Sequence, residues 1–409
     1  MHLLKLLTVP VFIVFGFMGC SNTPDIPTGI TFKHDTLKRL GGRGDNWCIT
    51  WTKDGSQITS MDDGNWLDGE HGYHNHIYRI IGDPGDFRRE DIPAYPQFIF
   101  DGNGWFGYGI VSVNGALYSM VSRTPGPNWD GPFRGVKMLK SPDNGQTWYR
   151  VSRDGQERFL DPWDESREEV NRKEMFFLEE SGRSRDGETA FPFSFCAFVQ
   201  NGQDNSAAKD EYVYIYSPEG SQAHQLLLAR VKQPEMEKRD SWEYFKSWEG
   251  DKPVWTSDLD DRGPVYEFPH KNDQDEAFGW YSWLPSVVWN EGLNLYIMVN
   301  GGTYAGHGLT GSAKDYFDRW MHTKTGSLGF WYSETPYGPW TQFYYTDYWI
   351  VDDEKNRTYQ PKLSPKWQSE DGKTMVLIWS DAMKNEKGHS HTVNYLWNQM
   401  EIEIQLDQK

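Results

Sequence analysis

The chain has 409 residues and a formal net charge of −18 at neutral pH. That length is enough for one large domain or two small ones, and so acidic a chain is not expected to bind nucleic acid, whose phosphates it would repel. With 20 Trp, 22 Tyr and 22 Phe beside 40 Gly and 22 Pro, the composition favours an all-β protein of many short strands and turns.

The N-terminus has the features of a bacterial lipoprotein signal. Lys5 precedes an apolar run from Leu6 to Phe17, which is too short to span a membrane and has the flanks of a signal peptide. Gly19-Cys20 then matches a lipobox, which predicts cleavage before Cys20 and acylation of that residue, for example with palmitate. The alternative is an ordinary signal peptide with an incidental cysteine.

We therefore divide the chain into a lipoprotein signal peptide over 1–19, a tether over 20–40 and a β-propeller catalytic domain over 41–406. The expected location is the bacterial cell envelope, where the protein is lipid-anchored in the outer membrane or at the cell surface. Cys48 and Cys196 are the remaining cysteines, too few for a disulfide framework, and we interpret both as small buried hydrophobic residues.

The stretch 44–64 predicts a β-hairpin that carries two carboxylates at its open end. Runs rich in β-branched and aromatic residues flank Asp54-Gly55, which is a strong signal for a two-residue turn. Such a turn pairs position 45 with position 64, so Asp45 lies next to Asp63, with opposed Cβ atoms about 5 Å apart. Two carboxylates placed in this way are candidates for general acid and base chemistry. The alternative is that they cap turns or bind a structural ion.

Similar pairs of strands recur along the chain, with turn glycines at positions 55, 115, 202, 292 and 372. These repeats predict a five-bladed β-propeller with four-stranded antiparallel blades. The segment 141–148 supports this, because Ser141-Pro142-Asp143-Asn144-Gly145-Gln146-Thr147-Trp148 matches the Asp-box turn of sialidases and other propellers. In that turn Asp143 is expected to accept hydrogen bonds from backbone N–H groups, and Trp148 is expected to pack between blades.

In a propeller, the loops after the second strand of each blade and the links between blades share one face, where we expect function. The same pairing rule predicts three opposed pairs at that face, which are Phe106 with Arg123, Trp283 with Asn300, and Lys362 with Asp381. Most histidines also fall in these loops. The predicted site residues, besides Asp45 and Asp63, are His74, Arg123, Trp66, Trp105, Trp283, Asn300, His307, Arg357, Tyr359, Lys362 and His391.

The order of several motifs resembles a known family. The motifs are Gly44-Asp45-Asn46-Trp47 with Asp63-Gly64, residues 80–87, residues 212–217 with 228–231, residues 337–340 and residues 369–373. Over roughly 41–404 they are similar to uncharacterised-domain propellers whose relatives include bacterial endo-D-arabinanases. The resemblance implies that the catalytic acids are two aspartates of the first blade, at Asp45 and Asp63. Asp62 and the histidine-rich loops depart from that branch, so the substrate identity is not carried over.

The leading hypothesis is a secreted, lipid-anchored glycoside hydrolase that acts on a polysaccharide or oligosaccharide. Asp45 and Asp63 would be its acid and its base or nucleophile. Arg123, Lys362 and Asn300 would bind hydroxyls or acidic groups, and Trp66, Trp105 and Trp283 would stack on sugar rings. We expect a monomer that requires no cofactor. A structural calcium ion in the channel stays open as an alternative.

Two other hypotheses remain. The first is a polysaccharide lyase that eliminates across a uronate, because β-elimination needs a base and a cation that stabilises the enolate. The residues available for that chemistry are His74, His307, His391, Tyr359, Arg123 and Arg357. The second is a glycan-binding surface lipoprotein without catalysis. Products with a conjugated double bond would identify a lyase, and binding without new reducing ends would identify the third class.

Overall fold

The computed structural model describes residues 25–69, 71–100, 105–122, 135–152, 155–159, 175–177, 192–219, 225–268, 284–303, 326–352, 356–384, 390–391 and 394–407. These residues are almost entirely β, as predicted. Their helices are short 3-10 turns, namely η1 (His34–Thr36), η4 (Gln203–Asn205), η5 (Gln233–Glu235), η6 (Arg239–Ser241) and η7 (Leu259–Asp261). Within the described part of the chain, no helix is long and apolar enough to cross a membrane.

The first two sheets are built from local antiparallel pairs. One contains β3 (Arg43–Asp45), β4 (Ile49–Trp51), β5 (Gln57–Asn65), β6 (Tyr73–Ile81), β7 (Arg88–Asp91) and β8 (Phe98–Ile99), with β3 and β4 both paired to β5. The other runs in chain order through β9 (Phe106–Val113), β10 (Ala116–Ser122), β11 (Lys137–Ser141), β12 (Tyr149–Val151) and β13 (Glu157–Phe159).

A ten-stranded sheet follows, and it divides where β14 pairs in parallel with β20. The first part has β14 (Ala197–Gln200), β15 (Tyr212–Pro218), β16 (Gln225–Lys232), β17 (Glu243–Glu249), β18 (Lys252–Thr256) and β19 (Tyr266–Glu267). The second part has β20 (Ser286–Asn290), β21 (Leu295–Thr303), β22 (Gly326–Ser333) and β23 (Thr341–Trp349).

The last sheet joins the two ends of the described chain. It contains β24 (Asn356–Gln368), β25 (Thr374–Lys384), β26 (Ser390–His391) and β27 (Asn398–Asp407) together with β1 (Ile26–Phe32) and β2 (Lys38–Arg39). β1 pairs antiparallel with β27 from Ile26 opposite Asp407 to Phe32 opposite Ile402. The predicted tether over 20–40 is therefore wrong from Ile26 onward, because alternating apolar residues there complete a sheet rather than remain a linker.

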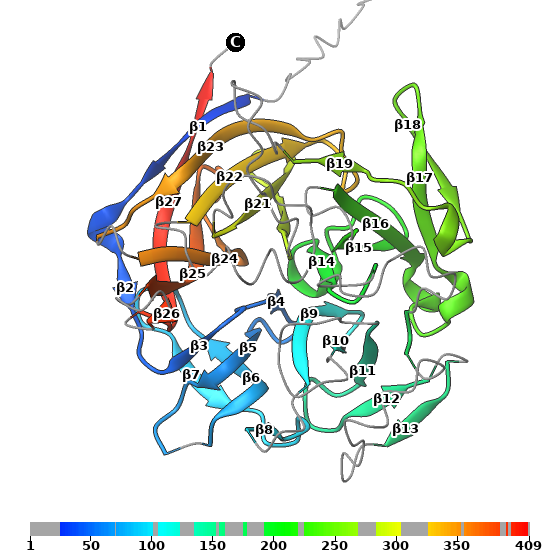
Figure 1. Ribbon diagram of the computed structural model, residues 1–409, viewed down its shortest axis with the longest axis horizontal. Coiled ribbons are helices and arrows are strands. Elements are labelled where there is room, and N and C mark those ends of the chain that lie inside the picture. The colour runs from blue at the N-terminus through cyan, green and yellow to red at the C-terminus, as the bar shows by residue number, and fades with distance from the viewer. Residues whose placement is uncertain are drawn as a thin grey trace, which may run out of the picture.

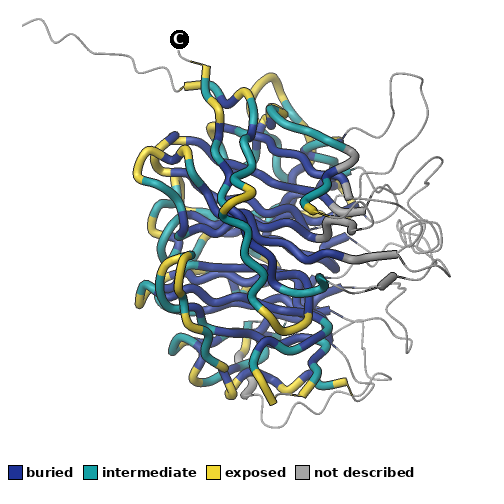
Figure 2. Tube along the Cα trace, turned by 90° about the vertical axis from the view of Figure 1, so that its left-hand side faces the viewer, coloured by how far each residue is buried: buried dark blue, intermediate teal, exposed yellow. Residues whose placement is uncertain are grey.

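The innermost strands contact one another in a ring, in the order β4, β9, β14, β20, β24 and back to β4. Figure 1 shows the sheets arranged around the centre of the molecule, with β4, β9, β14 and β24 nearest to it. Apolar side chains of neighbouring sheets form the core between them. In Figure 2 the buried strands run side by side through the molecule and end in exposed turns on one side.

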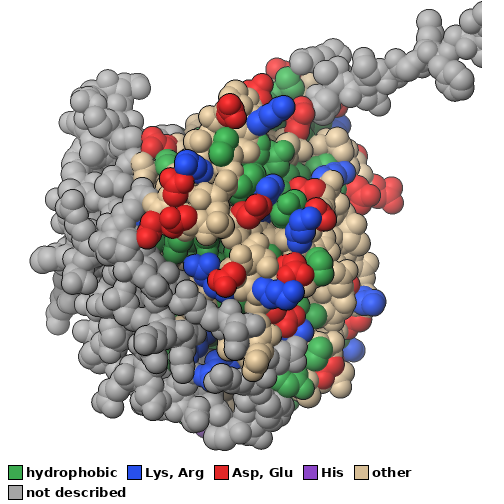
Figure 3. Space-filling view, turned by 90° about the vertical axis from the view of Figure 1, so that its right-hand side faces the viewer, with side chains coloured by type: hydrophobic (Ala, Val, Ile, Leu, Met, Phe, Trp, Pro, Cys, Tyr) green, Lys and Arg blue, Asp and Glu red, His purple; other side chains and the backbone are tan. Residues whose placement is uncertain are grey.

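A tryptophan cluster holds the first sheet against the last. The indole rings of Trp66 and Trp397 are stacked with centroids 4.7 Å apart, and Trp47 packs within 5.2 Å of both. The indole N–H of Trp47 also donates to the Ser380 hydroxyl, at 2.9 Å. The outer surface differs from this apolar seam, since Figure 3 shows acidic and basic side chains interspersed over its described part.

The segment 141–148 forms the turn between β11 and β12, where the sequence placed it. Asp143 accepts hydrogen bonds from the Thr147 backbone N–H at 2.8 Å and the Thr147 hydroxyl at 2.7 Å. The Ser141 hydroxyl accepts from the Gly145 N–H at 2.8 Å, and Trp148 is buried. Asp143 and Ser141 therefore have the hydrogen-bond partners that their residue types predict.

The first hairpin turn is longer than predicted. Thr52 donates its backbone N–H to Ser56 at 2.9 Å and Gly55 donates to Thr52 at 3.0 Å, so Lys53, Asp54 and Gly55 form a three-residue loop. Gly55 adopts φ +84°, the left-handed region that such a loop requires. The extra residue changes the strand pairing by one, and Ile49 lies opposite Thr59.

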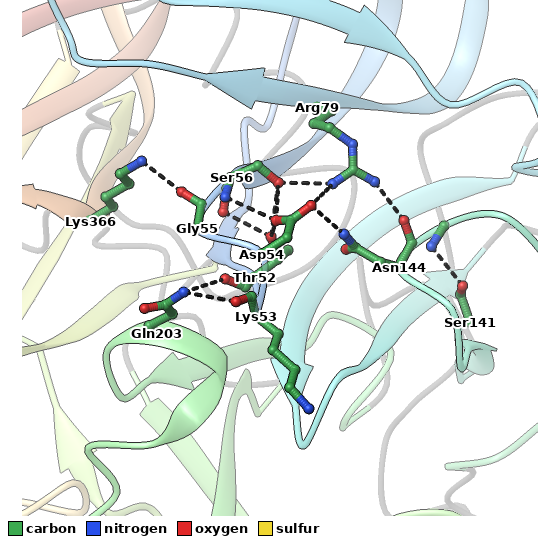
Figure 4. A network of polar contacts seen from close by, with 11 residues as sticks. Thr52, Lys53, Asp54, Gly55, Ser56, Arg79, Ser141, Asn144, Gln203 and Lys366 are labelled. Atoms are coloured by element: carbon green, nitrogen blue, oxygen red, sulfur yellow. Dashed lines mark hydrogen bonds and ion pairs between the residues drawn. The ribbon is translucent and has the colours of Figure 1, made fainter.

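The turn that contains Asp54 binds residues of the neighbouring sheets (Figure 4). The Asp54 carboxylate binds the Arg79 guanidinium at 3.0 Å and the Asn144 amide at 2.7 Å, and it accepts from Ser56. The ammonium group of Lys366 donates to the Gly55 carbonyl at 2.6 Å. The side-chain amide of Gln203 donates to the Lys53 carbonyl at 3.0 Å. Burial opposes ionisation of Asp54, but the hydrogen bonds from Ser56, Thr52 and Arg79 prevail and lower its pKa to about 2.

We expect Asp54→Asn to lower the free energy of unfolding by about 1 kcal/mol near neutral pH, because charged hydrogen bonds at a half-exposed site are screened. The folded pKa is depressed, so the stabilisation is present above about pH 4 and is lost as the pH falls toward 2. Urea unfolding of both proteins from pH 2 to 7 measures this. A stability difference that stays constant below pH 4 would contradict the assignment.

Candidate active site

Asp45 and Asp62 face each other at the end of the first sheet. They are paired positions of β3 and β5, and the register changes by one further residue between Ile49, which lies opposite Thr59, and Asp45. Both side chains are buried, each 4% exposed. The prediction that position 45 pairs with position 64, next to Asp63, is therefore wrong by two residues, because the three-residue loop shifts the pairing by one and the irregular segment between β3 and β4 shifts it by one more.

Asp62 receives three N–H donors. The side-chain amide of Asn75 lies 2.8 Å from Oδ1, the backbone N–H of Gly107 lies 3.0 Å from the same oxygen, and the Asn46 amide lies 3.1 Å from Oδ2. Asn75 is held in turn by the Tyr95 hydroxyl, which donates to its Oδ1 at 2.6 Å. These donors come from three segments of the chain, so they fix the carboxyl group in one orientation.

Gly107 allows the second sheet to approach this group. A Cβ at this position would lie 2.2 Å from the Asn75 amide nitrogen and 2.6 Å from the Ser60 hydroxyl. Glycine is therefore required for close backbone approach, since no larger side chain fits. The approach also lets the Gly107 carbonyl accept from the Asn46 amide at 2.5 Å.

Lys362 and Tyr395 complete the cluster from the last sheet and from the loop before β27. The Tyr395 hydroxyl donates to Asp45 Oδ2. Lys362 on β24 is 3% exposed and donates to the Leu284 carbonyl at 3.1 Å. It also interacts electrostatically with Asp45, Asp62 and Cys48. The ammonium group therefore compensates a buried negative charge that would otherwise be costly.

Burial, aided by the negative charge of Asp45, raises the pKa of Asp62 well above its usual range; the Gly107 N–H and the Asn46 amide oppose this only in part. Burial lowers the pKa of Lys362, against the attraction of Cys48 and the two carboxyls. Burial also raises the pKa of Cys48 to about 11, so its thiol is neutral. The cluster thus places two carboxyls and a lysine together in a buried position, where burial favours the neutral form of Asp62.

Asp63 lies outside this buried pair. It adopts φ +54°, and its half-exposed carboxylate is 3.4 Å from Nδ1 of His74. His74 packs edge-to-face against Phe106, with centroids 5.2 Å apart. His76 has a different partner, because its Nε2 lies 2.6 Å from Oδ1 of Asp91. Among the described residues, no group of three or more His, Cys, Asp or Glu side chains is placed to hold a metal ion.

Two predicted sugar-stacking residues belong to the core instead. Trp66 is 2% exposed and is enclosed by Trp47, Trp397 and the Arg89 guanidinium. Trp105 is fully buried in an apolar cluster. Neither ring offers a free face to a sugar, because both fill the interior beside the first sheet. Sequence alone did not separate these residues from a binding platform, since both uses favour the same residue type.

The other predicted pairs are shifted in the same way. Ser122, rather than Arg123, lies opposite Phe106, and Lys362 lies opposite Ile378 rather than Asp381. Asn300 is buried on β21, two positions from its predicted register, and among the described residues neither its amide nitrogen nor its oxygen has a hydrogen-bond partner. Arg123, Trp283 and His307 lie outside the described residues. Arg357 and Tyr359 on β24 and His391 on β26 are described only as strand positions.

The site residues that sequence reasoning missed are Asp62 as the facing carboxyl, Asn46, Asn75, Tyr95 and Tyr395. Asn75 had a usable signal, because it lies between His74 and His76 on a strand, where alternate side chains point to opposite faces. Tyr395 had none, since 350 positions separate it from Asp45.

No protein-family model matches the chain, and no curated protein matches it in sequence. Among solved structures, it is similar to the catalytic domain of a Coprinopsis cinerea GH62 α-L-arabinofuranosidase, with 10% identity, 90% of this chain and 92% of that chain covered, and a TM-score of 0.45. It is also similar to an α-L-arabinofuranosidase from Podospora anserina in complex with cellotriose, with 10% identity, 93% and 97% covered, and a TM-score of 0.44.

A thermostable family-43 glycoside hydrolase gives a similar result, with 11% identity, 90% of this chain and 91% of that chain covered, and a TM-score of 0.44. At these identities and TM-scores, the likenesses do not assign an activity to the chain.

We expect Gly107→Ala to destabilise the protein by about 1–3 kcal/mol, because the added methyl group overlaps the Asn75 amide that holds Asp62. Gly85→Ala is the matched control, since the nearest atom to its added Cβ is Lys38 Nζ at 3.9 Å. Urea unfolding measures both variants. Equal midpoints for the two would show that the close approach at Gly107 is not required.

Proposed function

We propose that the chain is a five-bladed β-propeller glycoside hydrolase whose two catalytic carboxyls are Asp45 and Asp62. The ring of contacts from β4 through β9, β14, β20 and β24 supports the propeller. The observation that best supports the activity is the opposed, buried carboxyl pair beside Lys362. The substrate class is a polysaccharide or oligosaccharide. In this proposal Asp62 replaces Asp63 as the second catalytic carboxyl.

In this proposal the two carboxyls take the two states that glycoside hydrolysis needs. Asp62, with its raised pKa, would carry the proton that passes to the glycosidic oxygen as the leaving group departs. Asp45 accepts a hydrogen bond from the Tyr395 hydroxyl and is attracted by the charge of Lys362. It would be the ionised carboxylate that acts on the anomeric carbon or on the attacking water. Asn75 and Tyr95 would keep the Asp62 carboxyl in position.

We expect Asp45→Asn and Asp62→Asn each to lower kcat by about 10²–10⁴-fold, which is the usual contribution of a general acid or base. Asp68→Asn, which changes an exposed aspartate in the loop after β5, is the matched control and retains kcat within a few-fold. The measurement is release of reducing ends from a panel of neutral and uronate polysaccharides, recorded together with the ultraviolet absorbance of conjugated double bonds.

The same panel separates the rival functions. Reducing ends accompanied by absorbance would assign elimination and reject the hydrolase. Binding of a panel member with neither signal would assign a non-catalytic glycan-binding protein. Loss of activity in Asp63→Asn with activity retained in Asp62→Asn would return the catalytic role to Asp63.

We further propose that the protein is anchored to the bacterial cell envelope through acylated Cys20, on the strength of Gly19-Cys20 after an apolar run. We expect Cys20→Ser to move the protein from the membrane fraction to the soluble fraction of cells that process lipoproteins. Fractionation followed by immunoblotting measures this. Retention of the variant in membranes would contradict lipid anchoring.

A further inference from the structure

Phe100 is an aromatic side chain exposed next to the proposed active site. It follows β8, and at 51% exposed it is the exposed large hydrophobic residue of the described chain. Burying a phenylalanine contributes about 1.5–3 kcal/mol, so leaving this ring in water gives up stability that a position in the core would provide. Aromatic side chains elsewhere in the described sheets are largely buried.

The Phe100 ring packs against Gly72 and His74. The Phe100 backbone N–H donates to the Gly72 carbonyl at 3.0 Å. A Cβ on Gly72 would lie 2.3 Å from the ring, so glycine makes room for it. The imidazole of His74 contacts the ring from the side, with centroids 4.8 Å apart at 77°. An ordered ring binds a ligand with a smaller loss of conformational entropy than a mobile ring.

Polar groups lie beside this ring. His74 joins Phe100 to the Asp63 carboxylate, which is 3.4 Å from Nδ1. The side chains of His74 and Asp63 are 21% and 37% exposed, so both are accessible to a ligand. Asp63 directly follows Asp62, which places the exposed group one residue from the buried pair. An apolar face, an acceptor and an imidazole therefore adjoin the catalytic carboxyls.

We propose that Phe100, His74 and Asp63 form a subsite that binds a neutral sugar ring of the substrate. The C–H face of the sugar stacks on Phe100, and its hydroxyl groups donate to Asp63 or bind His74. A uronate is disfavoured, because its carboxylate would be repelled by Asp63. This inference rests on the proposed function, and it gives Asp63 and His74 a role in binding rather than in the chemical step.

The test measures binding without turnover, in the Asp45→Asn background. The probes are soluble arabinan, xylan, β-glucan and polygalacturonate, and dissociation constants come from affinity gel electrophoresis and calorimetry. We expect Phe100→Ala to weaken binding of a neutral polysaccharide about tenfold, which corresponds to one stacking contact. Phe100→Trp retains binding within about twofold, and Phe100→Leu, which keeps apolar area without a ring face, weakens it.

Two further variants complete the design. Gly72→Ala displaces the Phe100 ring without altering it, and we expect weakened binding. Tyr212→Ala, which removes a half-buried aromatic ring on a different sheet, leaves the dissociation constant unchanged. Melting temperatures confirm that each variant is folded.

Unchanged binding by Phe100→Ala would overturn the subsite, and so would a preference for polygalacturonate. If no polysaccharide binds, both the subsite and the proposed function are rejected. If binding depends on Phe100 but the unmodified chain releases no reducing ends, the subsite stands and the hydrolase is rejected.

Discussion

The structure around the site depends on how one buried carboxyl group is satisfied. Asp62 is removed from water, and a polar group in that position is tolerated only with hydrogen-bond partners. Its partners come from the loop after β3, from β6 and from the start of β9. Satisfying this group therefore fixes the second sheet against the first, and the absence of a side chain at Gly107 is what permits the contact.

The sequence predicted the class of fold and the hairpins well, because turn residues and strand residues signal locally. Residues 116–120 pair with residues 109–113 as the turn at Asn114-Gly115 requires. Beyond the first few pairs the predicted register failed, since β-bulges change the pairing by one residue and leave no clear sequence signal. The first hairpin shows the cost, because a loop of three rather than two residues and a further one-residue shift before Asp45 moved the facing position from 64 to 62.

The surroundings of the site were harder to predict than its location. Asp45 was identified from its place at the start of the first hairpin, whereas Tyr395 and Lys362 reach it from the other end of the chain. No local pattern encodes such long-range contacts. The prediction that the tryptophans bind sugar failed for another reason. The indole N–H of Trp66 donates to the Leu40 carbonyl, and its ring fills the space between the first and last sheets. A large aromatic ring is equally suited to both roles.

The pairing of β1 with β27 would also set how far the molecule extends from a lipid anchor at Cys20. Strand pairing begins at Ile26, so little chain is left between the sheet and a lipid attached at Cys20. Fully extended, that segment spans at most about 20 Å. A lipid-anchored form would therefore hold the edge of its last sheet close to the lipid headgroups. Such a protein would reach polymers lying along the envelope surface more readily than polymers in the surrounding medium.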